Sequence, residues 1–162
     1  MVKIKNYSIK EIFDNEDTLK LTYNVDLIEY LKKYDGKKGY VFTGVLMRDE
    51  VKKMPIHDKQ FFIVNYDKST QEGSHWVAVV KRDNIIYHMG SYGLPPLQEV
   101  KAKFSKCTIY YSDTPMQLNS SSICGYLCLK FIEHMIKEKQ TLYEFLSKCM
   151  TYSNRYKKDI GQ

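Results

Sequence analysis

The sequence predicts an α+β fold in which a central, mostly antiparallel sheet is packed by helices. Three observations indicate this: two helical segments open the chain, β-rich segments fill its middle, and segments of helical period close it. The 162 residues contain no internal repeat and no low-complexity linker. Because a chain of this length suits one hydrophobic core, residues 1–162 are expected to form a single domain.

Two helical segments are predicted near the N-terminus. Ser8 and Glu11 have the spacing of a capping box, in which each residue bonds the other's backbone N–H group. Residues 25–34 then place apolar side chains at helical intervals, and the following Asp35 and Gly36 are typical of a helix end.

The middle of the chain is rich in β-branched and aromatic residues, which favour strands. The two strands on either side of residues 81–84 are expected to form a hairpin, because that short polar stretch suits a turn. The predicted strands are residues 40–42, 60–65, 75–81, 84–88 and 107–112.

Helical spacing returns after the break in regular structure at Pro95 and Pro96. Residues 97–105 fit a short helix, and residues 123–138 and 142–152 carry apolar side chains three and four positions apart. These segments complete the helical layer of the predicted domain.

The composition excludes several classes of protein. Hydrophobic residues make up 43% and charged residues 27% of the chain, which is too apolar for a disordered protein. The apolar runs are far shorter than the roughly 20 residues that span a bilayer, and the first residues lack the apolar stretch of a signal peptide. We therefore expect no membrane partner and no secretion by that route. The net charge of +6 suits polyanionic partners such as nucleic acid, or simply a solvated surface.

Cys124 is the first candidate for chemistry. It lies in the first turn of the predicted helix, after three serines, Ser120 to Ser122, that favour a helix N-terminus. Free N–H groups and the helix dipole at such a position stabilise a thiolate. The alternative is that Cys124 is a small buried hydrophobic residue, and the local context leaves both open. Cys128 and Cys149 lie in apolar stretches and are expected in the core. The four cysteines lack metal-binding spacing, so no metal is expected.

His75 is the best placed of the four histidines to act as a base for this thiol. It opens a predicted strand directly after a turn, so that its ring can project from a rigid edge. The remaining histidines, His57, His88 and His134, are expected to be structural or solvated. Gln117 lies seven residues before Cys124, where its amide could donate to an oxyanion, although a glutamine in a loop is usually just polar.

Taken in order, His75-Trp76, segment 87–93, Gln117 and Cys124-Gly125 resemble the adenovirus-type (adenain-like) cysteine proteases, which are related to the ubiquitin-like-protein proteases. Segments 42–50 and 62–67 resemble maturation proteases of virophages and Maverick-type elements, and the resemblance covers roughly residues 40 to 135. It implies a papain-like, adenain-like fold with Cys124 as nucleophile at a helix N-terminus, His75 as general base and Gln117 as oxyanion donor.

The chain departs from this resemblance at one position. The Asp, Glu or Asn that completes the triad in such proteases is replaced by Gly90, which has no side chain to orient an imidazole. A thiolate–imidazolium pair depends less on a third group than a serine triad does. We therefore expect a Cys124–His75 dyad, with a water, a backbone carbonyl or Ser91 holding the ring.

The resemblance implies a viral cysteine endopeptidase (a hydrolase) that cleaves structural-protein precursors during virion maturation, next to small residues such as Gly. Its substrates would be capsid or core precursors, in the virion and in the infected host cell. No cofactor is required, but relatives are activated by a viral peptide or DNA, and Cys107 is a candidate for a disulfide to such a peptide. The alternatives are an isopeptidase acting on ubiquitin- or SUMO-like proteins, and a catalytically weak pseudo-protease that binds DNA or capsid protein.

Overall fold

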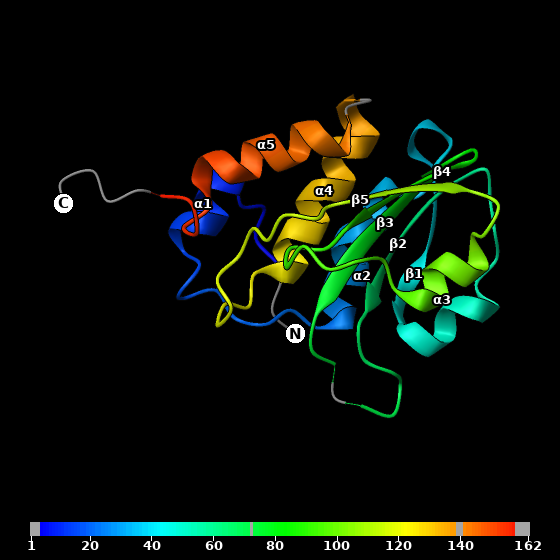
Figure 1. Cartoon of the computed structure of the whole chain (residues 1–162), viewed down its shortest axis with the longest axis horizontal. Helices are drawn as coiled ribbons and strands as arrows, with labels where there is room; N and C mark the ends of the chain where they lie inside the picture. The colour runs from blue at the N-terminus through cyan, green and yellow to red at the C-terminus, as the bar shows by residue number, and fades with distance from the viewer. Residues whose placement is uncertain (1–3, 72, 139–140, 158–162) are drawn as a thin grey trace.

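One mixed sheet forms the centre of the molecule (Figure 1). The computed structural model describes residues 4–71, 73–138 and 141–157, and within them the strand order is β1-β2-β3-β4-β5. The strands are β1 (Val41–Met47), β2 (Lys59–Asn65), β3 (Trp76–Arg82), β4 (Ile85–Met89) and β5 (Thr108–Tyr111). Every predicted strand is therefore present, and β1 is longer than expected.

The helices also lie where the sequence places them. Within the described ranges, no helix combines the length and apolarity needed to cross a bilayer. The α-helices are α1 (Ile9–Asp14), α2 (Asn24–Leu31), α3 (Gln98–Lys103), α4 (Cys124–Glu138) and α5 (Leu142–Tyr152), and the 3-10 helices are η1 (Lys32–Tyr34), η2 (Lys37–Gly39) and η3 (Arg48–Lys53).

The local signals explain where some of these elements begin. Ser8 caps α1, and Ser8 and Glu11 form both bonds of the predicted capping box. The 3-10 helix η3 was not predicted, because Val51 is the one apolar residue in its sequence and sets no helical period. It begins after Met47, whose backbone N–H donates to the Glu50 carboxylate at 2.7 Å.

The pairing of the strands differs in part from the expectation. The two central pairs, β2–β3 and β3–β4, are antiparallel, and β3 and β4 form the predicted hairpin. Both outer pairs, β1–β2 and β4–β5, are parallel. Parallel neighbours need a crossover connection, and the segments containing η3 and α3 supply the two crossovers.

Both faces of the sheet are covered. Phe61, Ile63 and Trp76 belong to the larger core, which α1, α2, α4 and α5 complete. The alternate residues Phe62 and Val64 belong to a smaller core with residues of α3 and η3. Because successive strand residues point to opposite faces, these central strands read as continuous apolar runs.

Helix α4 is the centre of the larger core. It packs against β3 on one side and contacts α1, α2 and α5 on the others (Figure 1). The ring of Phe131 is fully buried and meets Phe145 of α5 edge-on, with ring centroids 5.3 Å apart. This packing places the first turn of α4 at the end of β3 where Trp76 lies.

Replacing Phe131 by alanine should lower the free energy of unfolding by about 3–5 kcal/mol, because it leaves a cavity between α4 and α5. Guanidinium denaturation followed by the fluorescence of Trp76, the single tryptophan, measures this. Tyr143→Ala is the matched control, since that ring is 77% exposed on α5. Equal losses in both variants would contradict the assigned core.

Candidate active site

Cys124 is the first residue of α4, and its side chain is 3% exposed. The Leu127 N–H donates to the Ile123 carbonyl at 3.0 Å, so Ile123, and not one of the serines, occupies the N-cap position. Burial raises the pKa of the Cys124 thiol, although the backbone N–H groups of Trp76, Gly125 and Cys124 itself lower it in part. The effect of desolvation on this pKa thus outweighs that of the helix N-terminus in this conformation. Cys124 is therefore a neutral thiol here, whereas the sequence suggested a thiolate.

His75 directly precedes β3 and is 6% exposed. Its ring lies between two tyrosines: Tyr66, with ring centroids 5.2 Å apart, and Tyr92, with centroids 4.3 Å apart. Among the described residues, neither ring nitrogen has a hydrogen-bond partner. Burial, and in second place His88, lowers the pKa of His75 to about 4. The imidazole is therefore neutral at pH 7.

Cys124 lies near His75 because it contacts the backbone of the next residue. One of the three backbone N–H groups that act on the thiol belongs to Trp76, which directly follows His75 in the chain. The two side chains, however, are not hydrogen-bonded, because both nitrogens of His75 lack a partner in the described chain. The Cys124 thiol thus lies next to the backbone that follows His75, but no hydrogen bond between the two side chains is present to carry a proton.

Gln117 is fully buried in the loop before α4. Its Nε2 atom donates to the Ser121 carbonyl at 3.0 Å, the Ser121 hydroxyl at 2.9 Å and the Tyr92 hydroxyl at 3.2 Å. Its Oε1 atom accepts from the Ser91 hydroxyl. The amide is thus committed to loop contacts in this conformation, so the Ser91 hydroxyl is not the group that holds His75.

The loop that carries Gln117 is anchored by groups distant in sequence. The buried carboxylate of Glu16 accepts from the Leu118 backbone N–H and from the Asn154 side chain, both at 2.8 Å. Arg155 donates to the Gln117 carbonyl at 3.2 Å. These bonds connect α1 and the segment after α5 to the candidate oxyanion loop.

Tyr92 is a site residue that the sequence reasoning missed. Its ring packs at a tilt against His75, and its hydroxyl accepts from Gln117. Burial, and in second place the proximity of Cys124, raises the pKa of Tyr92. Its phenol therefore contacts His75 and Gln117 and lies near Cys124. The only sequence signal was its place in segment 87–93, which belongs to the resemblance to adenovirus-type proteases.

Gly90 is held through its backbone. The Ser112 hydroxyl accepts from the Gly90 N–H and donates to the Gly90 carbonyl, both at 2.9 Å. A Cβ atom at this position would meet Val77 Cγ1 at 3.0 Å and the Tyr66 hydroxyl at 3.9 Å. A side chain at position 90 would therefore need Val77 to shift slightly and would lie in contact with Tyr66.

The other candidate residues have structural surroundings. Cys128 and Cys149 are fully buried in the larger core, as predicted, and all four cysteines are free thiols. Cys107 is half-buried against the smaller core. His134 packs edge-on against Phe145, and its Nε2 atom lies 3.2 Å from the Thr141 carbonyl.

The two remaining histidines contrast with each other. His57 is exposed, as expected for a loop residue. His88 is fully buried in β4, and both of its ring nitrogens lack a partner among the described residues. Its burial lowers its pKa to about 4. His75 and His88 thus form a neighbouring pair of neutral imidazoles.

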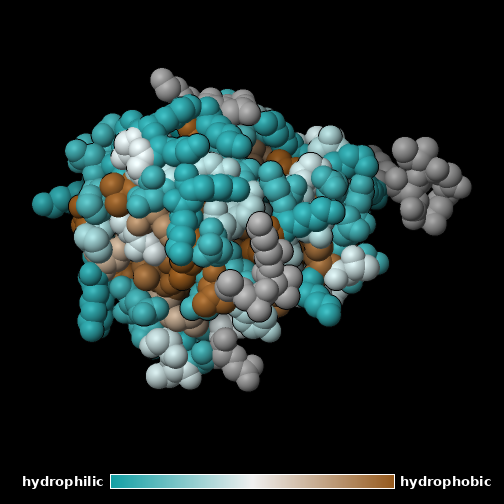
Figure 2. All heavy atoms as spheres, turned by 180° about the vertical axis from the view of Figure 1, so that it is seen from behind, coloured by the Kyte–Doolittle hydropathy of each residue, from teal (hydrophilic) through white to brown (hydrophobic). Residues whose placement is uncertain are grey.

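A cleft of about 220 Å³ lies beside Trp76. The segment before α2 forms one wall, where the Trp76 indole donates to the Thr22 carbonyl at 3.1 Å. Leu21 and Tyr23 in that wall are exposed. Figure 2 shows the back of the molecule as mainly hydrophilic, with hydrophobic side chains gathered in part of it. Neither the cleft beside Trp76 nor a larger hollow of about 530 Å³, between β1 and η3, is lined by Cys124, His75 or Gln117.

Glu16→Ala should lower the free energy of unfolding by about 1–3 kcal/mol, because the Leu118 N–H of the Gln117 loop and the Asn154 side chain both lose their bond to this buried carboxylate. Thermal or chemical denaturation measures this loss. Asp17→Ala is the matched control, since that side chain is exposed next to Glu16. If the two variants were equally stable, Glu16 would not anchor the loop.

The stability of the protein should fall as pH is lowered from about 6.5 to about 4. In this window the unfolded chain binds protons at His75 and His88, whereas the folded chain does not, so acid favours unfolding. Denaturation curves across this range should show a smaller pH dependence for His88→Leu than for the wild type. His57→Gln is the control and should keep the wild-type slope. An unchanged slope in His88→Leu would contradict the prediction.

The comparisons with known proteins agree with this geometry at the level of the fold. No family model matches the chain, and no curated protein matches it. Two crystal structures of the ASFV pS273R protease, one of them with selenomethionine, match at TM-scores of 0.61 and 0.60 and 16% identity. A structure of the SUMO protease Ulp1, with its catalytic cysteine oxidised to a sulfinic acid, matches at a TM-score of 0.47 and 15% identity, over 85% of this chain and 77% of that one.

The match to the ASFV pS273R protease covers 82% of this chain and 65% of that protease, so the chain spans less than two thirds of its length. The α+β cysteine-protease fold expected from the sequence is confirmed. The closer resemblance to adenovirus-type and virophage proteases stays a prediction. The chain has the fold of the ASFV pS273R protease.

Proposed function

We propose that this chain is a viral cysteine endopeptidase in which Cys124 is the nucleophile, His75 the general base and Gln117 an oxyanion donor. The observation that carries the proposal is the position of the Cys124 thiol. It lies at a helix N-terminus and at the backbone N–H next to His75, within a fold shared with the ASFV pS273R protease.

The proposed reaction is acyl transfer through a thioester. The Cys124 sulfur attacks a peptide carbonyl carbon while its proton passes to His75, and the oxyanion accepts hydrogen bonds from backbone N–H groups and from Gln117. The imidazolium then gives the proton to the leaving amine. Water hydrolyses the thioester and restores the thiol.

The site must rearrange before this chemistry begins. In the present conformation the thiol is buried, His75 lacks a polar partner among the described residues, and Gln117 donates to Tyr92 and Ser121. We infer that substrate or an activator opens the site, brings the imidazole to the thiol and frees an N–H of Gln117. Once the site is open to water, burial no longer prevents the Cys124 thiolate and the His75 imidazolium from forming.

The substrate would enter by the cleft beside Trp76. Trp76, the residue next to His75, is one of its lining residues. The preference for small residues, such as glycine, next to the scissile bond is proposed from the resemblance in sequence. Profiling with a peptide library tests this preference, and bulky residues favoured on both sides of the cut would contradict it.

The biological setting is proposed from the fold and from the resemblance in sequence. We propose that the natural substrates are capsid or core precursors, cleaved during virion maturation in the particle or the infected cell. DNA is a proposed activator, supported by lysines that gather around the ring of Tyr34: Lys33, Lys37 and Lys137 lie 5.4, 6.0 and 5.8 Å from its centroid. Such a cluster suits a phosphate backbone.

A viral peptide is the other proposed activator. The half-buried Cys107 is a free thiol and would be its disulfide partner. Cys107→Ser should then abolish activation by virion extract while leaving activation by DNA in place.

A pseudo-protease is the second candidate function. The observations that favour it are the missing side chain at Gly90 and the buried, neutral Cys124 thiol. Such a protein would bind DNA or capsid protein on a protease fold. It would not react with substrate under any condition, which separates it from a protease that awaits activation.

The decisive experiment combines a peptide-based thiol-reactive probe with cleavage of a glycine-containing peptide, with and without DNA and virion extract. Labelling and cleavage should vanish in Cys124→Ala and fall by more than about 10³-fold in His75→Ala. Cleavage should fall by about 10²-fold in Gln117→Ala, because one oxyanion donor is lost.

The matched control is Cys107→Ser, which should keep full labelling with DNA as activator. Ubiquitin-like fusion proteins tested in parallel identify an isopeptidase if they alone are cut. Labelling no faster than that of a free thiol, without turnover in any mixture, would contradict the protease proposal and favour the pseudo-protease.

A further inference from the structure

His75 lacks the polar support that a catalytic imidazole normally receives. Position 90 has no side chain, the Ser91 hydroxyl bonds Gln117, and the Ser112 hydroxyl bonds the backbone of Gly90. Neither ring nitrogen has a partner in the described part of the chain. Among the described residues, the ring has aromatic side-chain contacts.

The faces of the ring are held instead. Tyr66 lies nearly parallel to the imidazole, with an interplanar angle of 19° and ring centroids 5.2 Å apart. Tyr92 is tilted by 40° with centroids 4.3 Å apart. Aromatic contacts of this kind restrict rotation of the ring, and they attract it more strongly once it becomes a cation.

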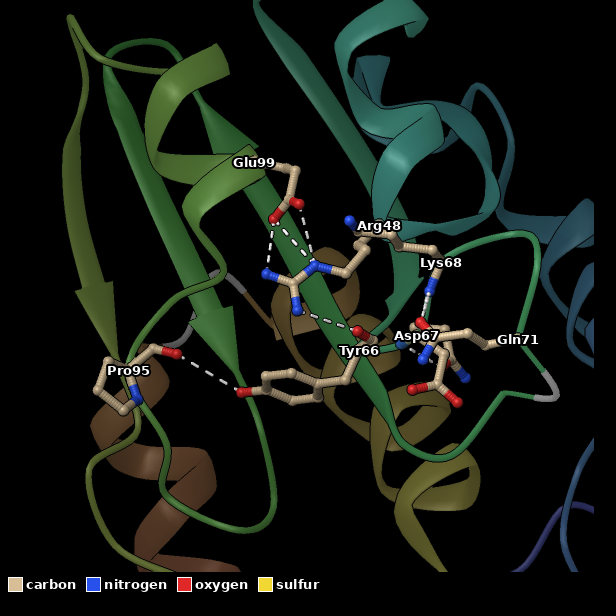
Figure 3. A network of polar contacts seen from close by, with 8 residues as sticks. Arg48, Tyr66, Asp67, Lys68, Gln71, Pro95 and Glu99 are labelled. Carbon is tan, nitrogen blue, oxygen red and sulfur yellow. Dashed lines mark hydrogen bonds and ion pairs between the residues drawn. The ribbon is translucent and has the colours of Figure 1, made fainter.

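Tyr66 is itself fixed along its whole length (Figure 3). Its backbone N–H donates to the His75 carbonyl at 2.9 Å, one step beyond the last ladder pair of β2 and β3. Its carbonyl accepts from Arg48 Nη1 at 3.1 Å, and its hydroxyl lies 3.5 Å from the Pro95 carbonyl. Arg48 is held in turn by the carboxylate of Glu99, with N–O distances of 2.8 to 3.1 Å.

The hydroxyl of Tyr66 borders the place that a triad acid would use. It lies 3.9 Å from the position of a Cβ atom at residue 90. This is an ordinary van der Waals distance, so Tyr66 lies directly beside position 90 as well as on the face of His75.

We propose that Tyr66 is a positioning residue that replaces the triad acid by stacking on His75 across the space left by Gly90. This inference rests on the proposed protease function. When the Cys124 proton passes to His75, the aromatic face of Tyr66 stabilises the imidazolium and keeps it aligned until the proton reaches the leaving amine. The ring, not the hydroxyl, performs this role.

The test compares Tyr66→Phe, which keeps the ring, with Tyr66→Leu, which removes it. In the activated enzyme Tyr66→Phe should stay within about threefold of wild type, and Tyr66→Leu should lose about tenfold or more in kcat with little change in KM. The acidic limb of the pH–rate profile should move only in Tyr66→Leu. Equal losses in both variants, or an unchanged profile in Tyr66→Leu, would overturn the proposal.

A rescue experiment separates positioning from a general loss of structure. Gly90→Asn in the wild-type background should lower activity, because the new side chain meets Val77 and Tyr66. In the Tyr66→Leu background the same change should raise kcat, since the asparagine then has room to orient His75. Independent effects of the two changes would contradict the inferred exchange of roles.

A readout without turnover keeps this inference distinct from the protease proposal. NMR titration of the His75 ring should show a lower pKa and a smaller ring-current shift in Tyr66→Leu than in Tyr66→Phe and wild type. If no mixture supports catalysis, the protease proposal fails while the titration still decides whether Tyr66 holds His75. Identical His75 signals in both variants would refute the stacking role.

Discussion

The packing of α4 against β3 is the contact on which the rest of the structure depends. It buries the apolar side of α4 against one face of the sheet and sets the first residue of that helix, Cys124, beside the first residue of β3, Trp76. A helix N-terminus and a strand end meet there. Their free N–H groups form a site suited to negative charge, although the same packing shields the thiol from water.

Desolvation governs the resting electrostatics of this site. It raises the pKa of Cys124 and lowers the pKa of His75, so both groups are neutral and no ion pair forms. The same burial makes each group sensitive to any change that admits water or charge.

The site also draws its support from both layers of the fold. On one side, Glu16 of the segment after α1 and Arg155 after α5 hold the loop of Gln117. On the other, Arg48 and Glu99 connect η3 and α3 to Tyr66, which stacks on His75. The Gln117 loop and the ring of His75 are thus supported by contacts from different layers of the fold.

The sequence by itself determined the helices and strands, their order, and the candidates Cys124, His75 and Gln117, because periodicity, capping and motif spacing are local properties. Only the tertiary structure decided that both edge strands run parallel, that the thiol is buried and neutral, and that Tyr66 and Tyr92 enclose His75. The physical reason is that desolvation and ring stacking arise between segments far apart in the chain, whose approach no local pattern encodes.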